Sequence, residues 1–197
     1  MSRQSGSPDK SFGYLTAVES PEHGYFGGYL VVSHLGRPLE FHCTAPIRPS
    51  RAQQILYGPT LEPYLLGEQI SGALLNVAKL TPCVILTDCE AALHARERFA
   101  VPMAMLLASR EPIEPDEIES QAATRIASSP LSSDFTFGGY QLQVPLGYEA
   151  DERDVTAALM ILSQHVDLAE PFARIRDAIR EAQRIGGRGT EAHDQAA

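Results

Sequence analysis

Long hydrophobic runs are missing from this sequence. The longest clean one, residues 101–108, has eight residues and includes Pro102, whereas a transmembrane helix needs roughly 20 apolar residues. The first ten residues also lack the apolar stretch of a secretion signal. The sequence therefore predicts a cytoplasmic protein that makes no contact with a membrane.

Cysteine is scarce, and its spacing is wrong for zinc. The three cysteines, Cys43, Cys83 and Cys89, cannot all pair with one another, which indicates reduced thiols in a cytoplasm. Zinc sites commonly pair cysteines two to four residues apart, and no such pair is present. Adjacent His42 and Cys43 would point to opposite faces of a strand. A nucleophilic Cys89 with His94 or His42 stays open, because it depends on proximity in the fold.

Basic residues are outnumbered. There are 16 Lys and Arg against 25 Asp and Glu, giving a net charge of −9. Bulk attraction to nucleic acid is therefore excluded, although a local basic strip or bridging metal ions would still allow contact. Arg37, Arg48 and Arg51 gather in the sequence around a predicted hairpin and its following loop, where they either contact phosphates or form an ordinary solvated loop. No glycine-rich phosphate loop is present.

What is present is enough for one domain. The chain has 197 residues, of which 44% are hydrophobic and 21% charged, the balance of a globular protein of one domain. Residues 1–10 and 186–197 show no apolar periodicity and are expected to be loose ends. The domain is expected to span residues 11–185.

The first half of the domain predicts three strands and a helix. The strands, at 12–18, 25–33 and 38–44, form an antiparallel meander with short turns. Gly27 and Gly28 suggest a bulge or a close backbone approach inside the second strand. A helical turn is expected at 51–56, and an amphipathic helix follows at 61–79.

The second half continues as an α/β domain with a mixed sheet. Continuous apolar runs predict strands that are buried on both faces, as in parallel sheets. A surface excursion is expected next, followed by a further strand and two closing helices. In the last helix, four arginines alternate with acids, as in a solvent-exposed face. The expected elements are strands at 82–87, 101–108 and 135–144, an excursion at 109–134, and helices at 151–165 and 167–185.

Two short stretches resemble the ribonuclease H-like fold. The Gly27-Gly28-Tyr29 sequence resembles the Gly-Gly-Tyr of the bacterial ribonuclease H hairpin, and residues 83–88 resemble the fourth strand of that family, which ends at a metal-binding aspartate. The resemblance covers about residues 12–108. It implies Mg²⁺-dependent phosphodiester hydrolysis, with carboxylates from the first strand, the first helix, the end of the fourth strand and a C-terminal element.

Each implied carboxylate has a candidate and an ordinary alternative. Asp88 would be the central metal ligand, or else a turn or helix-capping residue. Glu62 shares the apolar stripe of its helix, whereas Glu68 lies about 200° around from Leu66; their separations from Asp88 are 26 and 20 residues. Glu62 could also be a partner of the helix dipole. Glu19 would substitute on the first strand, and Asp88 with Glu62 would hold the metal.

The last carboxylate and the overall function remain open at this point. Asp151, Glu152 and Asp154 begin a helix and would be either the C-terminal ligand or partners of its dipole. A nuclease requires at least three carboxylates within about 5 Å of one point. The alternative is a catalytically silent accessory subunit of the same fold, with an apolar patch on the C-terminal helices or an edge strand that binds a protein partner or a second copy.

Overall fold

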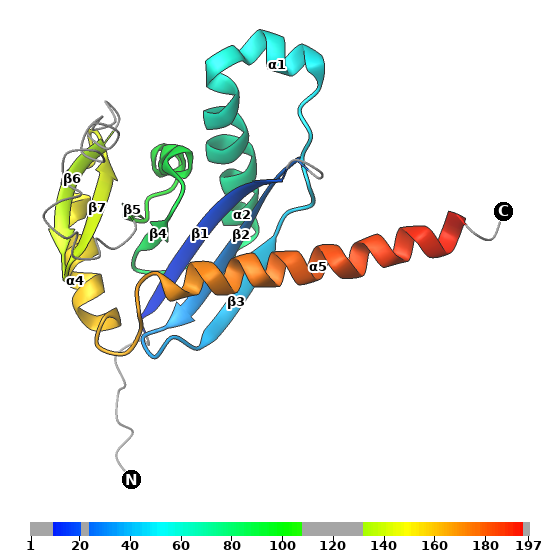
Figure 1. Cartoon of the computed structure of the whole chain (residues 1–197). Coiled ribbons are helices and arrows are strands. Elements are labelled where there is room, and N and C mark those ends of the chain that lie inside the picture. The colour runs from blue at the N-terminus through cyan, green and yellow to red at the C-terminus, as the bar shows by residue number, and fades with distance from the viewer. Residues whose placement is uncertain (1–9, 21–23, 108–131, 195–197) are drawn as a thin grey trace, which may run out of the picture.

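The computed structural model describes residues 10–20, 24–107 and 132–194. They form one mixed seven-stranded sheet with helices on both faces (Figure 1). The expected α/β class is confirmed. The strand order is β3-β2-β1-β4-β5-β7-β6. The expected loose segment 1–10 falls almost entirely outside the described residues, as does most of the predicted excursion at 109–134.

The N-terminal meander matches the sequence prediction closely. Strands β1 (Ser11–Ser20), β2 (Gly24–Ser33) and β3 (Pro38–Cys43) pair antiparallel in sequence order. A register shift between Val31 and Val32 marks a bulge opposite β3. Strand β2 is buried over most of its length because helices cover both of its faces.

The parallel part of the sheet is shorter than predicted. Strands β4 (Ile85–Thr87) and β5 (Met103–Leu106) run parallel to β1 and to each other, and every residue in them is buried. Pro82 and Pro102 fall in the predicted runs but before the observed strands, consistent with proline's lack of a backbone donor. A meander followed by a helix and by parallel strands is the topology that the resemblance to ribonuclease H implies.

One face of the sheet carries the helical segments that lie between β3 and β5. The predicted helix at 61–79 is a π-helix followed by an α-helix, and an added Cβ at Gly67 would collide with the Ala91 carbonyl of the neighbouring η3. These segments are α1 (Arg51–Tyr57), η1 (Gly58–Thr60), η2 (Pro63–Ile70), α2 (Ser71–Val77) and η3 (Glu90–Glu97). Helix α1 buries none of its residues and projects from the body (Figure 1).

The other face is covered by α4 (Asp151–Leu162) and α5 (Glu170–Asp194). Helix α5 continues past residue 185, where the sequence predicts its end. The single predicted strand at 135–144 is wrong: β6 (Ser132–Phe137) and β7 (Tyr140–Pro145) form a hairpin. Gly138 and Gly139 make its turn with φ of 55° and 86°, a two-residue turn that glycine favours.

Two adjacent glycines set the distance of both helical layers from the sheet. An added Cβ at Gly27 would collide with Ile70 of η2, and one at Gly28 would collide with Ile175 of α5. The predicted close backbone approach is confirmed, on both faces at once. None of the helices formed by the described residues is long and apolar enough to span a membrane.

Candidate functional site

Asp88 lies at the end of β4, on the side of the sheet that α5 covers. Its Oδ1 accepts a hydrogen bond of 2.6 Å from the Thr16 hydroxyl on β1, and its Oδ2 forms an ion pair with the Arg176 guanidinium on α5. Thr16 is fully buried, the Asp88 side chain is 15% exposed and that of Arg176 is 39% exposed. Both carboxylate oxygens are therefore satisfied by protein groups.

The strands and α5 bring these three side chains together through simple geometry. Leu15 pairs with Thr87 in the parallel β1–β4 ladder, which places the next residues, Thr16 and Asp88, side by side. Thr16 also pairs with Gly28, and the missing side chain there lets α5 lie close to the sheet at Ile175. The following residue, Arg176, then reaches the carboxylate.

The pKa of Asp88 is raised, because burial disfavours its charged form more than its partners favour it. The Thr16 hydrogen bond and the Arg176 charge act in the opposite direction. A carboxylate with one cationic neighbour and limited access to water is thus easier to protonate than a free aspartate.

The helical carboxylates lie elsewhere. Glu62 and Glu68 are both exposed, and η2 packs on the face of the sheet opposite α5 through Leu66 and Ile70. The expectation that Glu62 faces the sheet is wrong: Glu62 directly precedes η2, at its N-terminal end, and its side chain is exposed. Glu68 is exposed, as its angle from Leu66 predicts.

Glu19 is also separated from Asp88. It is three residues after Thr16 on β1, so alternation places it on the opposite face. It pairs with Tyr25, whose pKa is raised by burial and by a hydrogen bond to Glu19. Among the residues that the structure describes, no three His, Cys, Asp or Glu side chains form a group suited to a metal ion.

Asp151 has a structural role. Its two carboxylate oxygens accept hydrogen bonds from Arg96 Nε and Nη2 at 2.6 and 3.0 Å, and Oδ2 also accepts one from the Met103 backbone N–H. The Arg96 guanidinium lies 4.3 Å from the centre of the Tyr148 ring. This arrangement ties α4 to η3 and β5. Glu152 and Asp154 are exposed in the first turn of α4, as dipole partners would be.

In the part of the chain that the structure describes, the thiols do not assemble with histidine. Within the described residues, Cys89 makes no hydrogen bond to a histidine; its backbone bonds to the Thr87 hydroxyl instead. Burial raises the pKa of its thiol, which disfavours the nucleophilic thiolate. His42 is engaged with Glu40 at 2.6 Å. Cys83 is exposed, not buried in the core as its apolar surroundings in the sequence suggest.

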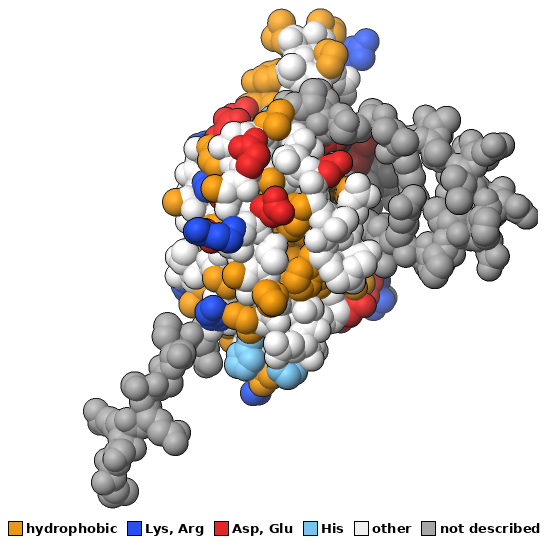
Figure 2. All heavy atoms as spheres, turned by 90° about the vertical axis from the view of Figure 1, so that its left-hand side faces the viewer, with side chains coloured by type: hydrophobic (Ala, Val, Ile, Leu, Met, Phe, Trp, Pro, Cys, Tyr) orange, Lys and Arg blue, Asp and Glu red, His pale blue; other side chains and the backbone are white. Residues whose placement is uncertain are grey.

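The three candidate arginines do not form one cluster. Arg37 is in the β2–β3 turn beside Ser33, whereas Arg48 lies against Gly24 at the other end of β2; nine residue steps of about 3.3 Å separate these ends. Arg51 begins α1. On the face shown in Figure 2, the described Lys and Arg side chains are scattered among acidic and apolar ones. Phosphate binding by these arginines stays a prediction.

The Asp88 cluster does not fit the Mg²⁺ that the resemblance implies. Mg²⁺ takes oxygen ligands and water, but here the guanidinium of Arg176 lies against one carboxylate oxygen and would repel a second cation. The Thr16 hydroxyl donates to the other oxygen and brings no negative charge. As it stands, both oxygens of Asp88 already bond to protein groups.

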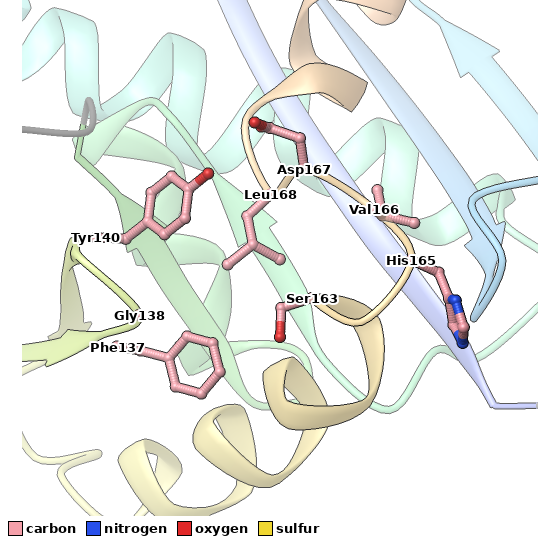
Figure 3. Close-up of a pocket in the computed structure, with 8 residues that line it drawn as sticks. All are labelled: Phe137, Gly138, Tyr140, Ser163, His165, Val166, Asp167 and Leu168. Carbon is pink, nitrogen blue, oxygen red and sulfur yellow. The ribbon is translucent and has the colours of Figure 1, made fainter. Parts of the chain in front are cut away.

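A separate pocket of about 500 Å³ lies between the β6–β7 hairpin and the α4–α5 connection. In Figure 3 the Phe137 and Tyr140 rings face Ser163 and Leu168 across it, while His165 points away. Burial and the neighbouring Asp167 carboxylate raise the pKa of Tyr140. None of the candidate site residues identified from the sequence lines this pocket.

Sequence reasoning located Asp88 and missed both of its partners. Thr16 gave no signal, because a threonine within a strand is ordinary. Arg176 was placed with the solvent-facing arginines of the last helix, three of which do pair within α5: Arg174 with Glu170, Arg180 with Asp177 and Arg184 with Glu181. No local signal separates Arg176 from the others: Arg180 likewise directly follows a residue of the apolar stripe, Ile179, yet pairs within α5.

Comparison with known proteins finds loose similarity to solved structures, among them the two described below. Neither a protein-family model nor a curated protein sequence matches the chain. Ciona intestinalis Endonuclease V in complex with a 24mer DNA containing an inosine followed by a ribo-adenosine is 14% identical, with a TM-score of 0.45 over 88% of this chain and 87% of that one. A D-to-N variant of that enzyme with a 23mer DNA is 16% identical, with a TM-score of 0.38 over 70% of each chain.

Proposed function

We propose that this chain is a ribonuclease H-like domain that works by binding, as an accessory subunit, and not by metal-dependent cleavage. The observation that supports this proposal is the occupation of Asp88 by Thr16 and Arg176. The first strand supplies a hydroxyl and the C-terminal helix a cation, at the two places where the resemblance implies carboxylates.

Phosphodiester hydrolysis with Mg²⁺ is the competing function that the resemblance implies. It would use Asp88 with Glu62 or Glu68 and Glu19. For these carboxylates to act together, Arg176 would have to leave Asp88, and the exposed glutamates would have to approach from the other face of the sheet. The two functions therefore differ in whether a divalent cation stabilises the protein through Asp88.

The experiment is a titration of Mg²⁺ and of Mn²⁺ into the purified full chain, followed by calorimetry and thermal melting. The variants are Asp88→Asn and Arg176→Ala, with Arg184→Ala as the matched control from the exposed face of α5. We expect millimolar metal to leave the melting temperature of the wild type unchanged. An increase that disappears in Asp88→Asn, together with Asp88-dependent cleavage of a labelled duplex, would overturn the proposal.

A further inference from the structure

Strand β3 forms one of the two edges of the sheet, and β6 forms the other. Among the described residues, the outward side of β3 therefore pairs with no other strand. Strand β3 also carries exposed apolar side chains: Leu39 is 49% exposed and Phe41 is 38% exposed. Val77 and Leu80, also exposed, lie at the end of α2 next to this strand. Unprotected apolar edges of this kind pair readily with another strand.

The direction of the backbone groups on β3 follows from its pairing with β2. The Thr44 N–H donates to the Gly27 carbonyl at 3.0 Å. Because hydrogen-bonding direction alternates along an antiparallel pair, His42 and Glu40 also direct their backbone groups towards β2. Phe41 and Cys43 therefore present their N–H and C=O groups outward.

The outward backbone groups of β3 fit a second copy of the strand in one register, although Glu40 already bonds its own His42 and the backbone N–H groups of Lys79 and Leu80. With a two-fold axis at Phe41, each Glu40 lies opposite the partner subunit's His42, and each Leu39 lies opposite the partner subunit's Cys43. The outward backbone groups of Phe41 then meet those of the partner subunit's Phe41. An axis at Glu40 would instead place two glutamates opposite each other, which is unfavourable for like charges.

Helix α5 also fits such an arrangement. It crosses β2 at Gly28, whose partner on β3 is Cys43, two residues from the axis. The two copies of α5 would thus lie on the same face of the joined sheet, related by the two-fold axis. Figure 1 shows α5 running out beyond β3, so each α5 would lie over the sheet of the other copy.

We infer that the chain forms a symmetric homodimer through antiparallel pairing of two β3 strands centred on Phe41. The second copy is favoured over an unrelated extended peptide because the outward backbone groups of Phe41 match each other about the two-fold axis, and because α5 runs out beyond β3 (Figure 1). This inference rests on the proposed binding function and names its partner. The two tests are separate, since dimerisation requires neither metal nor nucleic acid.

The first experiment measures the mass of the full chain by sedimentation between 1 and 100 μM. We expect twice 21.4 kDa for the wild type, and a monomer for Phe41→Lys, which places two ammonium groups at the axis. Leu56→Lys is the matched control: it changes an exposed leucine of α1 and should leave the dimer intact. A monomeric wild type at 100 μM, or a dimeric Phe41→Lys, would overturn the inference.

A second variant tests the register without weakening the interface. Phe41→Cys in a Cys43→Ser background should form an intermolecular disulfide under mild oxidation, because directly opposite residues of a hydrogen-bonded pair have Cα atoms about 5.5 Å apart. Leu56→Cys in the same background should not. Cross-linking of Leu56→Cys with none at position 41 would refute the proposed axis.

Discussion

Two aspartate–arginine pairs join helices to the sheet of this domain, and they differ in how completely their charges are satisfied. Asp151 accepts two hydrogen bonds from Arg96 and one from a backbone N–H, and both side chains are at most 15% exposed. Asp88 has one hydroxyl and one guanidinium, and that guanidinium is more than a third exposed. We call the Asp151–Arg96 pair the closed pair, because both side chains are largely buried. We call the Asp88–Arg176 pair the open pair, because its guanidinium is partly exposed to solvent.

The difference teaches how to separate a structural carboxylate from one in a position associated with chemistry. At the sequence level both aspartates are candidates for a metal site. In the fold, the hydrogen bond with Asp151 raises the pKa of Arg96, whereas burial outweighs Arg176 at Asp88 and raises the pKa of the acid. An acid whose cationic partner is partly exposed to solvent is the one that a new ligand could recruit.

Breaking the closed pair should have the largest effect. Asp151→Ala leaves Arg96 buried without its partner, which we expect to cost about 3–5 kcal/mol of the free energy of unfolding, measured by denaturant titration. Asp154→Ala, an exposed acid in the same turn of α4, should change it by less than about 0.5 kcal/mol. A loss below about 1 kcal/mol for Asp151→Ala would show that the two pairs are energetically alike.

Pushing α5 away from the sheet should loosen only the open pair. Gly28→Val places methyl groups where Ile175 packs, and we expect a loss of about 1–3 kcal/mol from overpacking, together with faster hydrogen exchange in α5. The control is Gly72→Ala, because an added Cβ there meets only Arg98, at 3.9 Å. Unchanged exchange in α5 would show that Gly28 does not set its position.

Removing the open pair itself should matter less. Arg176→Ala is expected to cost at most about 1 kcal/mol, because the guanidinium is partly solvated, and the loss should shrink further in 1 M salt, since ions screen the pair. It should also raise the pKa of Asp88 further. A loss as large as that of Asp151→Ala, independent of salt, would contradict the comparison.

The pH dependence sharpens the same point and should be the smallest effect. Because the folded-state pKa of Asp88 is raised above its ordinary value of 3.8, its contribution to stability is full below pH 3.8 and is lost as pH rises through the folded pKa. Asp88→Asn lacks this titration, so its stability relative to the wild type should increase across that range. A relative stability that falls with rising pH would mean that Arg176 dominates over burial.

The fold was more predictable than the site because it depends on patterns that are local in sequence. Alternating and continuous apolar runs identified the meander and both parallel strands. The glycine pair at Gly27 and Gly28 indicated that other elements lie close to the backbone of β2. The hairpin at Gly138-Gly139 was missed because its two short strands read as one. The π-helical turn was missed because apolar spacing alone assumes α-helical geometry.

Only one of the three residues of the candidate site, Asp88, could be predicted from the sequence. Asp88 follows a buried strand, which is visible in the sequence. Its partners are 72 and 88 residues away, and no local pattern reports which threonine or arginine the topology will bring there. The same limit applies to Asp151, whose acidic surroundings at a helix start conceal an ion pair with Arg96.

The position of α5 has a consequence for how the protein is made. All seven strands leave the ribosome before this helix does, because it follows them in the chain. Until it arrives, the sheet residues that Phe172, Ile175 and Ile179 cover in the folded domain are exposed to water, and Asp88 has no cation beside it. Nascent chains paused before Glu170 should therefore be prone to aggregation and should recruit chaperones.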